Sequence, residues 1–106
     1  MTEQIKRITE NEERMDHSRK VIDALKTALE DYQNNLETLE AFSGYYGSKE
    51  WMEDFEADEM GQLPQDLRRG VLSEDLGYEL LMDNHELISE LLKLAGKILE
   101  SEDNRK

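Results

Sequence analysis

Aromatic and basic side chains gather in the central part of the sequence, where Tyr45, Tyr46 and Trp51 are followed by Arg68 and Arg69. Aromatic and arginine side chains supply much of the binding energy at protein interfaces, and an arginine can grip a carboxylate or a phosphate. Two interpretations stay open: these residues form a core turn and neutralise acids within the fold, or they line a groove for another protein. We take the five as speculative partner-binding residues.

The other residue types form no catalytic or metal-binding constellation. The two histidines, His17 and His85, lack the HxxxH or HExxH spacing that places two zinc ligands on one helical face. The absence of cysteine excludes disulfides, thiol catalysis and thiolate-bound zinc. The tyrosines and serines have no poised base beside them. We therefore predict that the protein is not an enzyme and binds no cofactor or metal.

Two segments resemble ligand-binding loops only in part. If the acidic residue Glu56 is taken as the first calcium ligand, Met60 and Leu67 fall where the loop requires oxygen ligands. The Gly-Tyr-Tyr-Gly segment at 44–47 lacks the lysine and hydroxyl residue that end a phosphate-binding loop. Neither segment therefore predicts an ion site.

The formal net charge is -13, from 26 acidic and 13 basic residues. Binding to nucleic acids or anionic lipids relies on Lys and Arg, so an acidic surface argues against direct contact with either. The excess of acids indicates a solubilising surface, and the alternative is an acidic nucleic-acid mimic that binds a DNA- or RNA-binding protein.

No apolar run has the length of a signal peptide or membrane helix, so we expect a cytoplasmic protein.

The pattern of apolar residues predicts three helices. Residues 2–42 lack Gly and Pro and read as one long helix, with a narrow stripe from Ile22 to Leu39 that weakens toward the amino terminus. Gly44 is expected to end it. A short helix over 48–60 is predicted from Ser48 as its N-cap and Gly61 as its end.

The last predicted helix covers 73–101 and begins with Ser-Glu-Asp, a capping hydroxyl followed by two acids. Its apolar face is broad. One side carries Leu76, Leu80, Leu87, Leu91, Leu94 and Ile98, and the face is widened by Leu81, Ile88, Leu92, Ala95 and Leu99. A kink near Asn84 is the alternative to one continuous helix, and residues 102–106 are expected to be disordered.

We predict a single all-α domain in which the two long helices form an antiparallel hairpin, joined by a short helical elbow. In this arrangement the stripes Ile22–Leu39 and Leu76–Ile98 pack against each other. A small polar domain buries little surface alone, so we also expect a homodimer. A non-enzymatic interaction protein is the leading interpretation of the sequence.

The central third of the sequence contains two recognisable motifs: Tyr-Tyr-Gly-Ser-Lys-Glu-Trp, which begins at Tyr45, and Leu-Pro-Gln-Asp-Leu-Arg-Arg-Gly-Val-Leu-Ser-Glu-Asp, which begins at Leu63. In these motifs the sequence resembles a small bacterial family of helical proteins of similar length, described as a domain of unknown function. The resemblance implies a cytoplasmic protein of the Gram-positive type without an assigned activity. Since these motifs lie in the predicted elbow, they indicate that any functional site would lie there.

Overall fold

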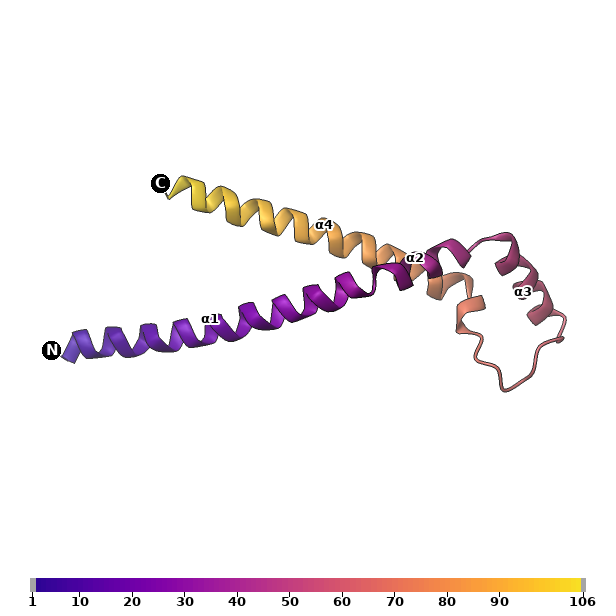
Figure 1. Cartoon of the computed structure of the whole chain (residues 1–106), viewed down its shortest axis with the longest axis horizontal. Coiled ribbons are helices and arrows are strands. Elements are labelled where there is room, and N and C mark those ends of the chain that lie inside the picture. Colours follow the sequence, from indigo (N-terminus) through magenta and orange to yellow (C-terminus); the bar gives the residue numbers. More distant parts are fainter. Residues whose placement is uncertain (1, 106) are drawn as a thin grey trace. The chain divides into compact units, whose positions relative to one another are not determined.

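The computed structural model describes residues 2–105, and every regular element in that range is helical (Figure 1). This confirms the all-α class. The elements are α1 (Thr2–Asn34), α2 (Leu36–Tyr45), α3 (Lys49–Glu59), the 3₁₀ turn η1 (Gly70–Leu72) and α4 (Glu74–Asn104). The chain divides into two compact units, Met1–Ala41 and Phe42–Lys106.

The helix expected over 2–42 is interrupted at Asn35, between α1 and α2. The Asn35 amide donates both to Asp31 O and to Tyr32 O, each at 3.1 Å. Asparagine is a poor interior residue for a helix because its side chain competes for backbone groups. Beyond this break α2 passes through Gly44 to Tyr45, since a glycine in a helix costs only about 1 kcal/mol. The expected end at Gly44 is therefore wrong by one residue.

The short helix α3 has both of its predicted ends. The Ser48 hydroxyl accepts a hydrogen bond from the Trp51 amide at 3.2 Å, which caps the first turn. At the other end Gly61 has a φ of +69°, and Gln62 N–H donates to Ala57 O at 3.0 Å. This is the pattern of a Schellman motif, in which glycine takes the left-handed conformation at low cost.

Helix α4 starts where the sequence predicts and ends later. The Ser73 hydroxyl accepts from the Leu76 amide at 3.2 Å, and Glu74 and Asp75 occupy the first turn, where they favourably face the helix dipole. The helix is continuous through Asn84, as expected, and runs past Ser101 to Asn104. The expected disorder is thus not found at 102–104, whose residues do not break a helix; residue 106 lies outside the described residues.

The core of the second unit is small and lies where α3, η1 and the start of α4 meet. Trp51 and Leu72 are only 6% and 7% exposed, and Gly77 is also buried. Such a core suits a polar chain of this length, because small domains bury a limited share of their surface.

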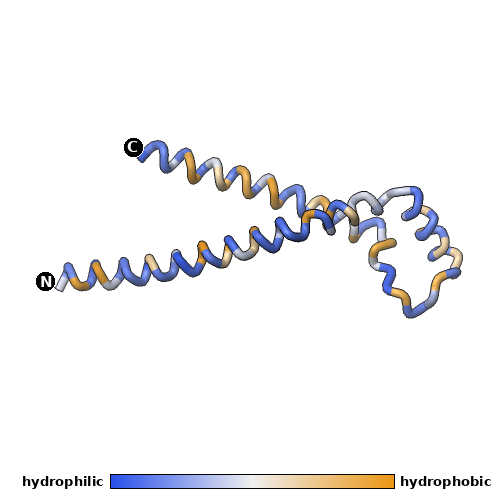
Figure 2. Tube along the Cα trace, in the orientation of Figure 1, coloured by the Kyte–Doolittle hydropathy of each residue, from blue (hydrophilic) through white to orange (hydrophobic). Residues whose placement is uncertain are grey.

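Most residues of the apolar stripes of the long helices are exposed. Orange apolar positions recur along α4 in Figure 2. On α1, Ile22, Leu25 and Leu29 are 54%, 51% and 47% exposed, and on α4 Leu94 is 54% exposed. The packing of these stripes into an antiparallel hairpin stays a prediction.

Candidate functional site

Two of the predicted binding residues belong to an aromatic ladder inside the second unit. Phe42 stacks on Tyr46 with ring centroids 5.7 Å apart, and Tyr46 meets Trp51 edge to face at 5.4 Å. Trp51 in turn stacks on Phe55 at 5.3 Å. Such pairs add stability beyond the area they bury. The ladder therefore joins α2 to α3.

The polar ends of the same rings tie the ladder to the following elements. Trp51 Nε1–H donates to Val71 O in η1 at 2.9 Å, and the Tyr46 hydroxyl donates to Glu74 O at the start of α4. The Tyr46 ring also packs on Gly77, where a Cβ would lie 2.7 Å from Cδ1 and 2.9 Å from Cζ. These contacts give Tyr46 and Trp51 a structural role.

Tyr45, at the end of α2, pairs with Asp54 of α3. Its hydroxyl donates to Asp54 Oδ2 at 2.6 Å. This hydrogen bond, together with partial burial and the negative charges of Asp54 and Glu50, raises the pKa of Tyr45 to about 12 from its ordinary 10.0. The hydroxyl is therefore held in its protonated form and acts as a donor, so it is unsuited to act as a base.

The two arginines differ in their surroundings. Arg69 forms a salt bridge with Asp58 and donates to Pro64 O and, from Nε, to Leu67 O at 3.3 Å. It thereby fixes the extended connection between α3 and η1, in agreement with the interpretation of an arginine that neutralises an acid within the fold. Arg68 is exposed and forms no ion pair with any residue in the range 2–105.

A hollow of about 340 Å³ lies beside Arg68 in the elbow, which we define as residues 45–73. Its walls are apolar, and the Tyr45–Asp54 pair and Arg68 supply its polar groups. The lining residues are Tyr45, Asp54, Leu63, Leu67, Arg68, Val71 and Leu72. The structure thus brings Tyr45 and Arg68 to one hollow and places Trp51 and Arg69 elsewhere. Sequence reasoning missed Leu63 and Leu67, which stand next to Pro64 and two arginines in an otherwise polar segment.

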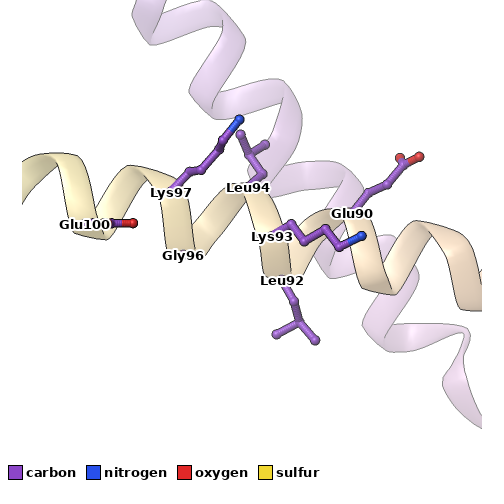
Figure 3. A pocket seen from close by; sticks show the side chains of 7 residues that line it. All are labelled: Glu90, Leu92, Lys93, Leu94, Gly96, Lys97 and Glu100. Atoms are coloured by element: carbon purple, nitrogen blue, oxygen red, sulfur yellow. The ribbon is translucent and has the colours of Figure 1, made fainter.

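A larger hollow of about 630 Å³ runs along the surface of α4 near Gly96. Figure 3 shows that its side chains do not converge, because Leu92 points to the side of the helix opposite Leu94 and Lys97. A small-molecule site needs groups that converge on the ligand, so this surface is a helix face and not a ligand site.

The described residues also lack two other kinds of site. Among residues 2–105 no three His, Cys, Asp or Glu side chains gather in a way that could hold a metal ion. Within the same range no helix has the length and hydrophobicity to cross a membrane.

Residues 8–94 of the chain match the family described as domain of unknown function DUF4298. The chain belongs to this family. No curated protein and no solved structure matches this chain. The segment of this DUF4298 member that matches the family includes the whole elbow. It therefore also includes the hollow beside Arg68. The role of Tyr45, Tyr46, Trp51, Arg68 and Arg69 in binding a partner stays a prediction.

Proposed function

We propose that the protein is a non-enzymatic protein–protein interaction module that binds a segment of another protein in the elbow hollow. The observation that carries the proposal is the exposed Arg68, which has no ion-pair partner among residues 2–105, beside apolar walls from Leu63, Leu67 and Val71. An arginine next to apolar surface suits a peptide that presents an apolar side chain and a carboxylate. The exposures of Leu67 and Val71, 48% and 40%, leave surface for such a contact.

The other elbow residues support this function as a scaffold. Trp51 ties α3 to η1, Tyr46 ties the end of α2 to the start of α4, and Arg69 ties the connection between α3 and η1 to Asp58 on α3. A binding site gains affinity when its walls are held in place before the partner arrives. The proposal is for contact and not for catalysis, because the Tyr45 hydroxyl and the Arg69 guanidinium are already engaged within the fold.

We further propose that the long helices form the antiparallel hairpin. The narrow stripe of α1 matches one side of the α4 face, the row Leu76, Leu80, Leu87 and Leu94. Beside this row α4 carries four acidic residues, Glu79, Asp83, Glu86 and Glu90. At the positions that flank its own stripe, α1 carries four basic residues, Arg7, Arg14, Arg19 and Lys26, and one acidic residue, Glu12. Opposite charges beside an apolar seam favour such a pairing.

Affinity purification from the native cell tests the function. We expect Arg68→Glu to reduce the amount of captured partner at least about tenfold, since reversing a charge in a contact costs more than about 1.4 kcal/mol. Lys49→Glu is the matched control, because Lys49 is an exposed base on α3 outside the hollow. Equal loss in both variants would indicate a general charge effect and would refute the hollow as the site.

The acidic nucleic-acid mimic is the second candidate. The observation in its favour is α4, in which nine acidic residues and only two basic ones occur between Glu74 and Asn104. A mimic would capture basic DNA- or RNA-binding proteins, and their complexes would weaken steeply with salt. Partners that are retained at high salt and lost in Arg68→Glu favour the elbow hollow.

A further inference from the structure

We infer that the protein segment bound in the elbow hollow carries charges of both signs, a carboxylate that pairs with Arg68 and a base that pairs with Asp54, on either side of an apolar side chain. This inference rests on the proposed function and names the chemistry of its partner. It makes Asp54 the residue that distinguishes such a segment from one with a carboxylate alone.

The hollow is lined by one charged group of each sign. Arg68 and Asp54 both belong to its lining, and its apolar walls include Leu67 and Val71. No salt bridge within residues 2–105 joins Arg68 to Asp54, although their charges are opposite. Each of the two side chains therefore keeps its charge available to a group of a bound segment.

Tyr45 orients Asp54 without neutralising it. The Tyr45 hydroxyl donates to Asp54 Oδ2 at 2.6 Å, and the Asp54 carboxylate forms no salt bridge within the described range 2–105. An ionised carboxylate has two oxygens that together accept several hydrogen bonds. One neutral donor therefore leaves Asp54 able to bind a base, and it holds the carboxylate at the wall of the hollow while that base approaches.

Filling the hollow gives both charges a need for a partner. An apolar side chain that enters the hollow displaces water from Arg68 and Asp54, and a charge that loses its water is unfavourable unless an opposite charge replaces it. A segment with a carboxylate alone would pair Arg68 and leave Asp54 beside apolar atoms. A segment that also carries a base pairs both charges and avoids this cost.

The charge of the elbow favours the same kind of segment. Between residues 45 and 73 the sequence contains seven acidic and three basic residues, and one of these bases, Arg69, is already paired with Asp58. The excess of acids repels a purely acidic segment, whereas a base on the segment offsets this repulsion. Charge complementarity therefore selects a segment of both signs over an acidic one.

Peptide titration of the isotope-labelled full chain, followed by the NMR amide signals of Leu67 and Val71, tests the inference. The probes are acetyl-Glu-Gly-Leu-Gly-Lys amide, whose charged and apolar side chains share one side when it is extended, and the peptide of reversed sequence. We expect the tighter binder to lose about fivefold in affinity when its Lys is replaced by Gln.

Two variants locate this preference. Asp54→Asn is expected to abolish it, although the amide oxygen still accepts from the Tyr45 hydroxyl. Glu53→Gln is the matched control, because it changes the net charge equally at a neighbouring residue outside the lining of the hollow, and it should keep the preference.

Equal affinity for the Lys and Gln peptides, or a preference that survives in Asp54→Asn, would overturn the inference. The same holds if neither charged peptide binds. Equal binding of a peptide with Gln at both ends would show that Arg68 and Asp54 pair with each other, which also overturns it. In all these cases the proposed function still stands if Arg68→Glu loses the cellular partner, whereas unchanged capture by Arg68→Glu refutes the proposed function itself.

Discussion

At the scale of single residues, the elbow depends on polar atoms at the ends of aromatic rings. Trp51 Nε1 and the hydroxyls of Tyr45 and Tyr46 each find a specific acceptor. A ring that is partly buried needs such an acceptor for its polar atom, because an unsatisfied buried donor costs about 1–3 kcal/mol. The rings therefore fix both the packing and the orientation of the elements that supply the acceptors.

The titration of Tyr45 follows from its bond to Asp54. Its pKa is raised from 10.0 to about 12 in the folded protein, so the protonated hydroxyl stabilises the fold below about pH 10. This contribution is lost as the pH rises from about 10 toward about 12. In a spectroscopic tyrosinate titration one tyrosine is expected to ionise late. Asp54→Ala should lower its pKa toward 10.0, whereas Glu53→Ala should not; an unchanged late phase in Asp54→Ala would contradict the assignment.

The contact between Gly77 and Tyr46 predicts opposite effects for two glycines of α4. A methyl group at position 77 would clash with the Tyr46 ring, lying 2.7 Å from its Cδ1 and closer still to Cε1, and we expect Gly77→Ala to destabilise the protein by about 1–3 kcal/mol. Gly96→Ala has open space around it and should stabilise the helix by about 1 kcal/mol. Urea unfolding measures both. Equal stabilisation by the two substitutions would show that the ring does not pack on Gly77.

At the scale of elements, the ends of α3 and α4 are set by local capping. Ser48 and Ser73 each accept an amide hydrogen bond from the residue three positions later. Gly61 then reverses the chain after α3. These ends are specified by neighbouring residues, because capping bonds span only a few positions along the chain.

Alanine at position 61 is expected to weaken α3. The φ of +69° costs a residue with a Cβ about 1–2 kcal/mol, so Gly61→Ala should lower the free energy of unfolding by that amount. Gly44→Ala is the control. Because Gly44 lies inside α2 with open space around it, this substitution should raise the free energy of unfolding by about 1 kcal/mol. Thermal unfolding followed by circular dichroism compares them. A neutral Gly61→Ala would mean that the left-handed turn is not required.

At the scale of the whole molecule, net charge opposes every association between copies. With 26 acidic and 13 basic residues, each chain repels another over about one Debye length, about 10 Å at 0.1 M salt. Apolar contact must outweigh this repulsion for the expected homodimer to form. Salt weakens the repulsion and leaves the apolar contact in place.

The homodimer expected from the sequence should therefore strengthen with salt. Sedimentation equilibrium should give a lower dissociation constant at 0.5 M than at about 0.05 M sodium chloride, because screening is stronger at the higher concentration. A complex with a basic nucleic-acid-binding protein should show the opposite trend. A dimer that dissociates at high salt would indicate that ion pairs and not apolar contacts stabilise it.

The sequence by itself determines what depends on near neighbours. The all-α class, the Ser48 and Ser73 caps, the end at Gly61 and the broad face of α4 all follow from spacing, glycine and capping residues. Periodicity and capping involve residues within about one or two helical turns of each other. They can therefore be identified from the sequence alone. The break at Asn35 was not predicted, because a single asparagine is only a weak helix breaker.

Only the tertiary structure decided which side chains are engaged and which are free. In the sequence Arg68 and Arg69 are equivalent neighbours, but Arg69 is bound to Asp58 and Pro64 while Arg68 faces the hollow. Likewise Trp51 looks like an interface residue and is 6% exposed. The acceptors Val71 O and Glu74 O lie far along the chain from the rings they bind. Contacts between distant positions carry no local pattern, because folding and not spacing brings their partners together.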